Sequence, residues 1–127
     1  MKITVALSMV ASFVFGAVAV QGLHAQAKPP AYVIAMPNPT DADGYAKDYA
    51  AFVPASFQPF SGHYIVRGGK KVVFNGNPPN VVVIAFDSLE KAQAWRDSAA
   101  YKALIPARDK AIGNGTYTSF AIEGVPN

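Results

Sequence analysis

Apolar runs bounded by proline, glycine and asparagine predict the strands of one sheet. Residues 31–36 form a short run of strand-forming side chains that ends at Pro37, which cannot donate a ladder hydrogen bond. Residues 81–86 (VVVIAF) are so uniformly apolar that both faces of this strand should be covered. A last strand is expected over residues 116–122, directly after the glycine-rich turn at 113–115.

A hairpin is predicted over residues 62–74. The glycine pair at 68–69 supplies the positive φ values that a tight turn needs, and strand-forming residues flank it at 62–67 and 71–74. The turn-forming residues 75–80, rich in asparagine and proline, then separate this hairpin from the next strand.

Two helical regions are predicted between the strands, and the first covers residues 41–60. In it Tyr45, Tyr49 and Phe52 follow one another at spacings of four and three residues, which puts them on one stripe of a helix. Pro54 removes one intrahelical donor, so the helix should bend about four residues earlier and form two short pieces.

The second helical region is expected to begin at Asp87. Asp87 and Glu90 have the spacing at which each side chain can satisfy the other's exposed backbone donor at a helix start. Apolar residues at helical spacing continue to Ile112, and Pro106 predicts a break over residues 103–106.

The order of these elements is strand, helix, strand pair, strand, helix, strand. Its simplest packing is an α+β fold of ferredoxin-like type, an antiparallel sheet with both helices on one face. Runs such as 81–86 would then expose apolar side chains on the other face. A second copy stacked sheet on sheet would cover them, so we expect a homodimer.

The first 27 residues predict an N-terminal signal peptide helix. Lys2 precedes the uncharged apolar run 3–23, and the small residues of Ala25-Gln26-Ala27 suit a peptidase that cleaves after Ala27. A linker at 28–30 and a domain over 31–125 would remain, periplasmic or secreted, with no membrane contact. The alternative is a retained membrane anchor, because the 21-residue run exceeds the roughly 20 residues that span a bilayer.

Charge and composition exclude several classes of function. Without Lys2 the 11 basic residues become ten, against eight acidic ones, and they are dispersed, which argues against nucleic-acid binding. The chain has no cysteine, so it has no disulfide framework or lipid-modified cysteine. After the leader His63 is the one histidine, so we expect no metal site, no cofactor and no serine-hydrolase triad.

Three segments together resemble one family: GHYIVRGG at 62–69, VVIAF at 82–86 and AWRDSAAY at 94–101. With Arg108 and Val125, they make the chain similar to the DUF1330 domains of unknown function over nearly all of its length after the leader. The resemblance implies the dimeric α+β barrel superfamily. Its members include cofactor-independent monooxygenases, small-molecule isomerases, haem-handling enzymes and proteins without known activity, and the resemblance does not select among them.

Two features depart from that family pattern and weaken the transfer of function. Many DUF1330 members are cytoplasmic and lack a leader, whereas the pattern over residues 1–27 predicts one here. The second helix reads Trp95-Arg96 where an aromatic pair is common.

A set of aromatic and cationic residues is expected to converge between the helices and the sheet. Because neighbouring strand residues point to opposite faces, His63 and Tyr64 cannot both line that cleft. By the same parity Arg67 shares the face of His63, so a His63 and Arg67 cluster competes with one built on Tyr64. The full set is Tyr45, Tyr49, His63, Tyr64, Arg67, Trp95, Tyr101 and Arg108.

Arg108 lies on an apolar stripe, where a charge is costly unless it is paired or hydrated. A ligand carboxylate in the cleft could pair with it through two parallel hydrogen bonds. Alternatively its aliphatic stem covers the core while the guanidinium reaches water, Asp97 or Asp109. His63 could instead be an ordinary half-exposed strand residue. The tyrosines and Trp95 could instead be core residues whose polar ends are hydrogen-bonded.

Three functions remain open from the sequence. The first is a binding or accessory homodimer that holds a small anionic or aromatic molecule. The second is a cofactor-free enzyme in which His63 or a tyrosine moves a proton and Arg67 or Arg108 stabilises developing negative charge. The third is a purely structural dimer.

Overall fold

The computed structural model describes residues 28–126, so the predicted leader over 1–27 lies outside the described part of the chain. Residues Pro29–Val125 form one unit built on a four-stranded antiparallel sheet of order β2-β3-β1-β4. This is the strand order of a ferredoxin-like fold, as predicted. The strands are β1 (Ala31–Asn38), β2 (His63–Val66), β3 (Val82–Phe86) and β4 (Thr116–Glu123).

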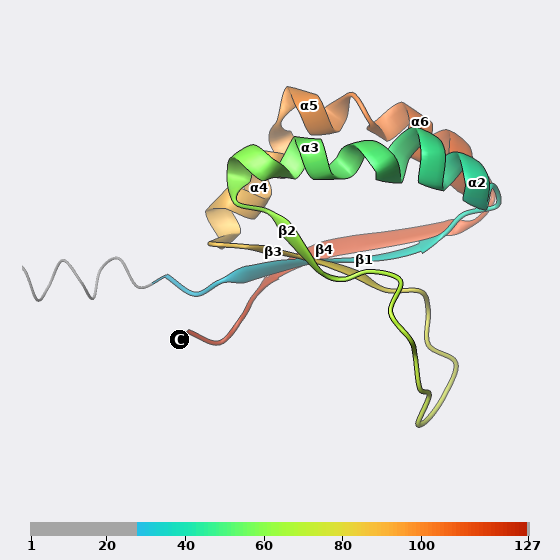
Figure 1. The fold of residues 1–127 in the computed structure, drawn as a ribbon, viewed down its shortest axis with the longest axis horizontal. Coiled ribbons are helices and arrows are strands. Elements are labelled where there is room, and N and C mark those ends of the chain that lie inside the picture. The colour runs from blue at the N-terminus through green and yellow to red at the C-terminus, as the bar shows by residue number, and fades with distance from the viewer. Residues whose placement is uncertain (1–27, 127) are drawn as a thin grey trace, which may run out of the picture. The chain divides into compact units, whose positions relative to one another are not determined.

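Both helical regions lie on one face of the sheet (Figure 1), which confirms the predicted layering. The first region comprises α2 (Ala42–Gly44), a π-helical turn (Tyr45–Tyr49), a 3₁₀ turn (Ala50–Phe52), α3 (Val53–Phe57) and a second 3₁₀ turn (Gln58–Phe60). The second comprises α4 (Leu89–Asp97), α5 (Ala99–Lys102) and α6 (Ile105–Ile112).

The core lies between these two layers. Val33, Ile84 and Phe86 contribute apolar side chains from the sheet, and Phe57 and Trp95 meet them from the helices. The Phe57 ring stands edge-on to Phe86 and Trp95, with ring centroids 6.5 and 6.4 Å apart. Such pairs add to the free energy gained by burying the rings.

The first helical region changes its hydrogen-bonding pattern at Ala50, which confirms the predicted bend. Tyr49 has backbone angles of φ −123° and ψ −66°, outside the α-helical range, and the 3₁₀ turn follows it. Pro54 then occupies the first turn of α3, where a missing backbone donor costs little.

The second helical region begins one residue later than predicted. Ser88, not Asp87, caps α4, because its Oγ accepts a hydrogen bond from the Lys91 backbone nitrogen at 3.2 Å. The Asp87 carboxylate instead lies 3.4 Å from Lys91 Nζ, and both side chains are well exposed. The expected Asp87 cap was therefore wrong, since the adjacent serine takes that position.

Two breaks divide the second region, and the sequence predicted one of them. Pro106 begins α6, as the expected interruption over 103–106 requires. The other break is at Ser98, whose Oγ donates to the Trp95 carbonyl at 2.7 Å and accepts from the Tyr101 backbone nitrogen at 3.2 Å. One serine thus closes α4 and caps α5.

The predicted return strand at 71–74 was wrong. β2 pairs directly with β3, and the residues between these strands contain no regular secondary structure. They leave the sheet on the side opposite to the helices (Figure 1). A hydrogen bond of 2.8 Å from Lys71 Nζ to the Pro79 carbonyl joins the two sides of this segment, residues 67–81.

An irregularity in β2 also overturns the predicted parity of Arg67. Tyr64 is opposite Ile84 and Val66 is opposite Val83, so one extra residue is accommodated between them. Arg67 therefore joins the face of Tyr64, and its guanidinium carbon lies 4.7 Å from the centroid of that ring. A β-bulge shifts every later side chain to the other face, which a strict alternation cannot anticipate.

The face of the sheet opposite to the helices, here called the open face, is apolar. In the register of the strands Ile34 lies between Val83 and Phe120, and Tyr32 lies between Ala85 and Ile122. His63 is opposite Ala85 and therefore lies on this same face. Large apolar side chains are exposed there, among them Ile65, Val66, Phe120 and Ile122.

Candidate functional site

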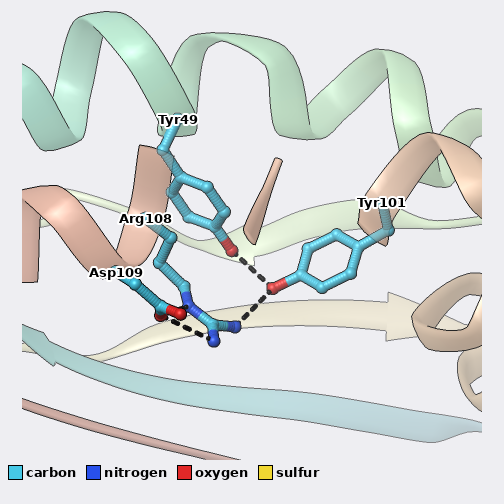
Figure 2. Close-up of polar contacts among 4 residues, drawn as sticks. All are labelled: Tyr49, Tyr101, Arg108 and Asp109. Atoms are coloured by element: carbon cyan, nitrogen blue, oxygen red, sulfur yellow. Dashed lines mark hydrogen bonds and ion pairs between the residues drawn. The ribbon is translucent and has the colours of Figure 1, made fainter. Parts of the chain in front are cut away.

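Four tyrosines and one arginine form a cluster between the helices and β4, here called the tyrosine–arginine cluster. Tyr49 and Tyr101 share a hydrogen bond of 2.7 Å between their hydroxyl oxygens, and Arg108 Nη1 donates to the Tyr101 hydroxyl at 3.2 Å (Figure 2). The Arg108 guanidinium carbon lies 4.6 Å from the Tyr117 ring centroid. Tyr45 completes the cluster, with its ring centroid 5.1 Å from that of Tyr49.

Local structure explains how these side chains converge. The π-helical turn carries Tyr45 and Tyr49, and π-helical turns occur frequently at functional sites. The break at Ser98 begins α5, which carries Tyr101. From α5 the Tyr101 hydroxyl reaches the Tyr49 hydroxyl of the first helical region. Tyr117 comes from β4, where it lies opposite Pro37 on the helix-facing side of the sheet.

Arg108 is a nearly buried cation. Its side chain is 13% exposed, and its partner Asp109 is 64% exposed. Both Arg108 Nε and Nη2 donate to a single oxygen, Asp109 Oδ1, at 3.2 and 3.0 Å. Burial alone would lower the pKa of Arg108, but the Tyr101 hydroxyl and the Asp109 carboxylate keep this pKa above its ordinary value. The guanidinium is therefore charged at any physiological pH.

Tyr45, Tyr49 and Tyr117 are protonated hydrogen-bonding groups and not bases. Burial raises the pKa of Tyr45, Tyr49 and Tyr117 above the ordinary value of a phenol. Their hydroxyl groups therefore keep their protons at neutral pH. Together with one permanent positive charge, these donors favour an oxyanion, either a bound carboxylate or a negative charge that develops during a reaction.

The remaining predicted residues lie elsewhere. Tyr64 packs edge-on against Phe57 with ring centroids 5.1 Å apart and carries Arg67 on its ring, as a separate pair at the end of β2. Burial raises the pKa of Tyr64, and Arg67 partly opposes this effect. His63 lies on the open face, so it does not share a site with Tyr64 or with Arg108.

Trp95 belongs to the core. Its ring centroid lies 4.4 Å from that of Tyr101, and its Nε1 donates to Ser56 Oγ at 2.9 Å. Ser56 in turn donates to the Val53 carbonyl at 2.6 Å. The indole nitrogen of Trp95 and the hydroxyl of Ser56 are thus both hydrogen-bonded inside the core. This agrees with the interpretation of Trp95 as a core residue with a satisfied polar end.

The sequence predicted Tyr45, Tyr49, Tyr101 and Arg108 as candidates, and the structure brings these four together. It also confirms Asp109 as an acidic neighbour of Arg108. Tyr117 was missed as a member of the cluster. The signal that could have identified it is its place in the alternation of β4, which turns it toward the helices.

The described part of the chain has neither a metal-binding cluster nor a helix that could span a membrane. Over residues 28–126 no group of three histidine, cysteine, aspartate or glutamate side chains is placed to hold a metal ion. None of the helices in this range has the length and apolar character needed to cross a membrane.

Solved structures with a similar fold also lack an assigned activity. A protein of unknown function from Rhodopseudomonas palustris is 12% identical with a TM-score of 0.63, over 77% of this chain and 84% of that one. The methylated form of that protein gives 12% identity and a TM-score of 0.62, over 77% and 82% of the two chains. Likeness at this identity concerns the fold alone.

Sequence comparison is more specific about the family. None of the curated proteins matches this chain significantly. Residues 30–125 match DUF1330, described as a domain of unknown function. This match covers nearly all of the described part of the chain, and it agrees with the motifs at 62–69, 82–86 and 94–101. The protein therefore belongs to the DUF1330 family.

Proposed function

We propose that this protein is an exported DUF1330 domain that binds a small anionic molecule with an aromatic or apolar body. The observation that carries the proposal is the state of Arg108. Its side chain is 13% exposed, and its Nε and Nη2 edge contacts one oxygen of an exposed carboxylate on the neighbouring residue, Asp109.

The Nε and Nη2 edge of a guanidinium is suited to two parallel hydrogen bonds with both oxygens of a carboxylate. Both bonds from Arg108 to Asp109 share one oxygen, so a ligand carboxylate that displaced Asp109 could offer each donor an oxygen of its own. The Tyr101 hydroxyl meanwhile holds Nη1, which fixes the orientation of the guanidinium. These contacts support a ligand carboxylate as the anionic group.

The aromatic rings around Arg108 support a ligand with a flat or apolar body. Tyr117 lies under the guanidinium, and Tyr45 and Tyr49 border the same region. Aromatic side chains with protonated hydroxyls provide apolar contact and a few oriented donors, which is the usual composition of a small-molecule site. The proposed ligand class is therefore an aromatic or cyclic carboxylic acid.

The enzymatic alternative has weaker support. It requires a base beside the cation, and the raised pKa values of Tyr45, Tyr49 and Tyr117 leave these three tyrosines protonated. His63 lies on the open face, on the other side of the sheet from Arg108. A tyrosine acting as a proton donor remains the enzymatic role that best fits this cluster.

The proposal includes a homodimer in a periplasmic or secreted setting. Support for the dimer is the apolar open face, which carries exposed Phe120 and Ile122 and which a second copy would cover. Support for export is the leader pattern over residues 1–27 with a cleavage site after Ala27.

The experiment is calorimetric titration with benzoate, and with benzamide as a neutral molecule of the same shape. We expect benzoate to bind the wild-type protein more tightly than benzamide. Arg108→Met should weaken benzoate binding about tenfold to 100-fold, the range expected for loss of a charge-assisted hydrogen-bonded pair. Asp109→Asn should strengthen it, because the internal competitor for the guanidinium is gone.

Arg67→Met is the matched control, because Arg67 also lies over a tyrosine ring, 4.7 Å from the centroid of Tyr64. Binding of benzoate to this variant should equal that of the wild type. Equal affinity of Arg108→Met and wild type, with urea unfolding showing both folded, would contradict the proposed site. So would equal affinity of the wild type for benzoate and benzamide.

A further inference from the structure

The segment 67–81, here called the arm, exposes a continuous apolar stretch. Val72, Val73 and Phe74 are 66%, 51% and 89% exposed. The arm projects from the side of the sheet that carries the open face (Figure 1). Its returning end, residues 77–80, lines a hollow together with Met36 and Thr118, which belong to that face.

Exposed apolar side chains are concentrated on this side of the molecule. Over residues 28–126, seven of the nine exposed large apolar side chains belong to the arm or to the adjoining strands β2 and β4. Their exposed fractions run from 43% for Val66 to 89% for Phe74. Such a concentration of exposed apolar side chains on one side of a protein favours an interaction surface.

One stretch of the arm has a composition that favours a strand, yet it forms none in the subunit. Residues 71–74 (KVVF) combine β-branched and aromatic side chains, which favour an extended strand. In the subunit this stretch forms no strand, although β2 is an edge strand that pairs only with β3 in the described sheet. Its backbone is thus available to pair with a strand from another molecule.

We propose that the arm of each subunit packs against the open face of a second copy and that residues 71–74 pair there, as a strand, with an edge strand of that copy. This inference rests on the homodimer of the proposed function and adds the element that holds it together. Between its two ends the arm encloses an open hollow of about 680 Å³ lined by Val66, Phe74 and Val82, among others. This concave apolar surface adjoins the open face at Val66, so a partner could contact both surfaces at once.

Charge is compatible with this partner. The arm carries Arg67, Lys70 and Lys71 and has no acidic residue, so it would be repelled by a basic surface. The open-face positions of the strands carry no lysine or arginine, and His63 is their one ionisable group apart from Tyr32. A second copy therefore offers the arm an apolar surface without like charge.

The test uses the protein expressed from its full gene and purified as the cell processes it. Sedimentation measures its oligomeric state, and hydrogen exchange measures the protection of the arm amides. We expect a dimer in which the amides of residues 72–74 are protected. The double variant Val72→Ser with Phe74→Ser should raise the dimer dissociation constant about 100-fold, as loss of two buried apolar contacts does. Phe52→Ser, an equally drastic change at an exposed phenylalanine of the helix layer, should leave the dimer intact.

Phe120→Lys tests the open face separately from the arm. If Phe120→Lys separates the subunits while the arm variant stays dimeric with freely exchanging 72–74 amides, the arm proposal is wrong and the homodimer stands. A monomeric wild-type protein overturns both. If the arm variant loses binding to phosphatidylglycerol vesicles but not to its partner, the arm contacts lipid and the proposal is wrong.

Discussion

At the scale of single residues, Tyr101 links Tyr49 of the first helical region to Arg108 of α6. Its hydroxyl accepts from Arg108 and shares a hydrogen bond with Tyr49, and the Arg96 guanidinium carbon lies 4.9 Å from its ring centroid. The side chain itself is 1% exposed. A buried charge is tolerated when neighbouring dipoles are oriented toward it, and Tyr101 supplies such a dipole to Arg108.

The protonation of Tyr49 predicts how stability depends on pH. Burial raises the pKa of Tyr49 above its ordinary value of about 10. Below that pH the folded and unfolded chains bind the same proton. Above it the unfolded chain loses the proton first, so the free energy of unfolding falls, by up to about 1.4 kcal/mol per pH unit for one such group.

Tyr49→Phe isolates this contribution. The variant should be about 1 kcal/mol less stable at neutral pH, because it loses the hydrogen bond to Tyr101. Its stability should fall less steeply above pH 10 than that of the wild type. Urea unfolding measured from about pH 7 to about pH 11.5 gives both quantities, and identical slopes for the two proteins would contradict the buried, protonated phenol.

The residues of the cluster were predictable in part from the sequence. Tyr45 and Tyr49 share a helical stripe, and Arg108 is conspicuous as a charge on an apolar stripe. Their convergence on Tyr101 was not derivable, because it depends on the break at Ser98, which no proline or glycine marks. The bulge before Val66, which turns Arg67 toward Tyr64, likewise has no local sequence signal.

At the scale of elements, the start of α4 distinguishes two caps that the sequence offers. The structure assigns the cap to Ser88, whose Oγ accepts from Lys91, and gives Asp87 only an exposed ion pair. Ser88→Ala should therefore lower the free energy of unfolding by about 1 kcal/mol. Asp87→Ala should change it by less than about 0.5 kcal/mol, because exposed ion pairs contribute little.

Urea denaturation of the two variants beside the wild type makes this comparison. A larger loss for Asp87→Ala than for Ser88→Ala would contradict the observed cap and favour the Asp87 and Glu90 capping box that the sequence predicted. The denaturant slopes should match that of the wild type, since neither change alters the surface exposed on unfolding.

Elements with strong local signals were predicted well. The uniformly apolar run at 81–86 and the run at 116–122 became β3 and β4, and Pro106 marked the break before α6. The failure at 71–74 has a different origin. The composition of that stretch favours a strand, but the chain leaves the sheet after Val66 and does not return along the outer edge of β2. Composition reports the preference and not the partner.

At the scale of the whole molecule, the leader pattern predicts a processed protein. When the full gene is expressed with its own leader, the intact mass of the exported protein should equal that of a chain beginning at Lys28. Mass spectrometry of the periplasmic fraction measures this directly. A protein that keeps residues 1–27 and sediments with membranes would contradict cleavage and favour the anchor alternative.

The two faces of the sheet have separate roles in this account. The helix-facing side holds the tyrosine–arginine cluster, and the open face with the arm is the surface proposed to bind a second copy. Because Arg108 and Phe120 lie on opposite sides of the sheet, substitutions on one side should leave the function of the other largely unchanged. Ligand binding and assembly can therefore be measured independently.

The measurement that tests the central claim most directly is the NMR resonance of the Arg108 Nε–H group during titration with benzoate. We predict a saturable shift of this resonance as the ligand carboxylate replaces Asp109 Oδ1, while benzamide leaves it unchanged. A resonance that does not respond to benzoate, in protein shown by its other resonances to be folded, would contradict the assignment of Arg108 as the anion-binding residue.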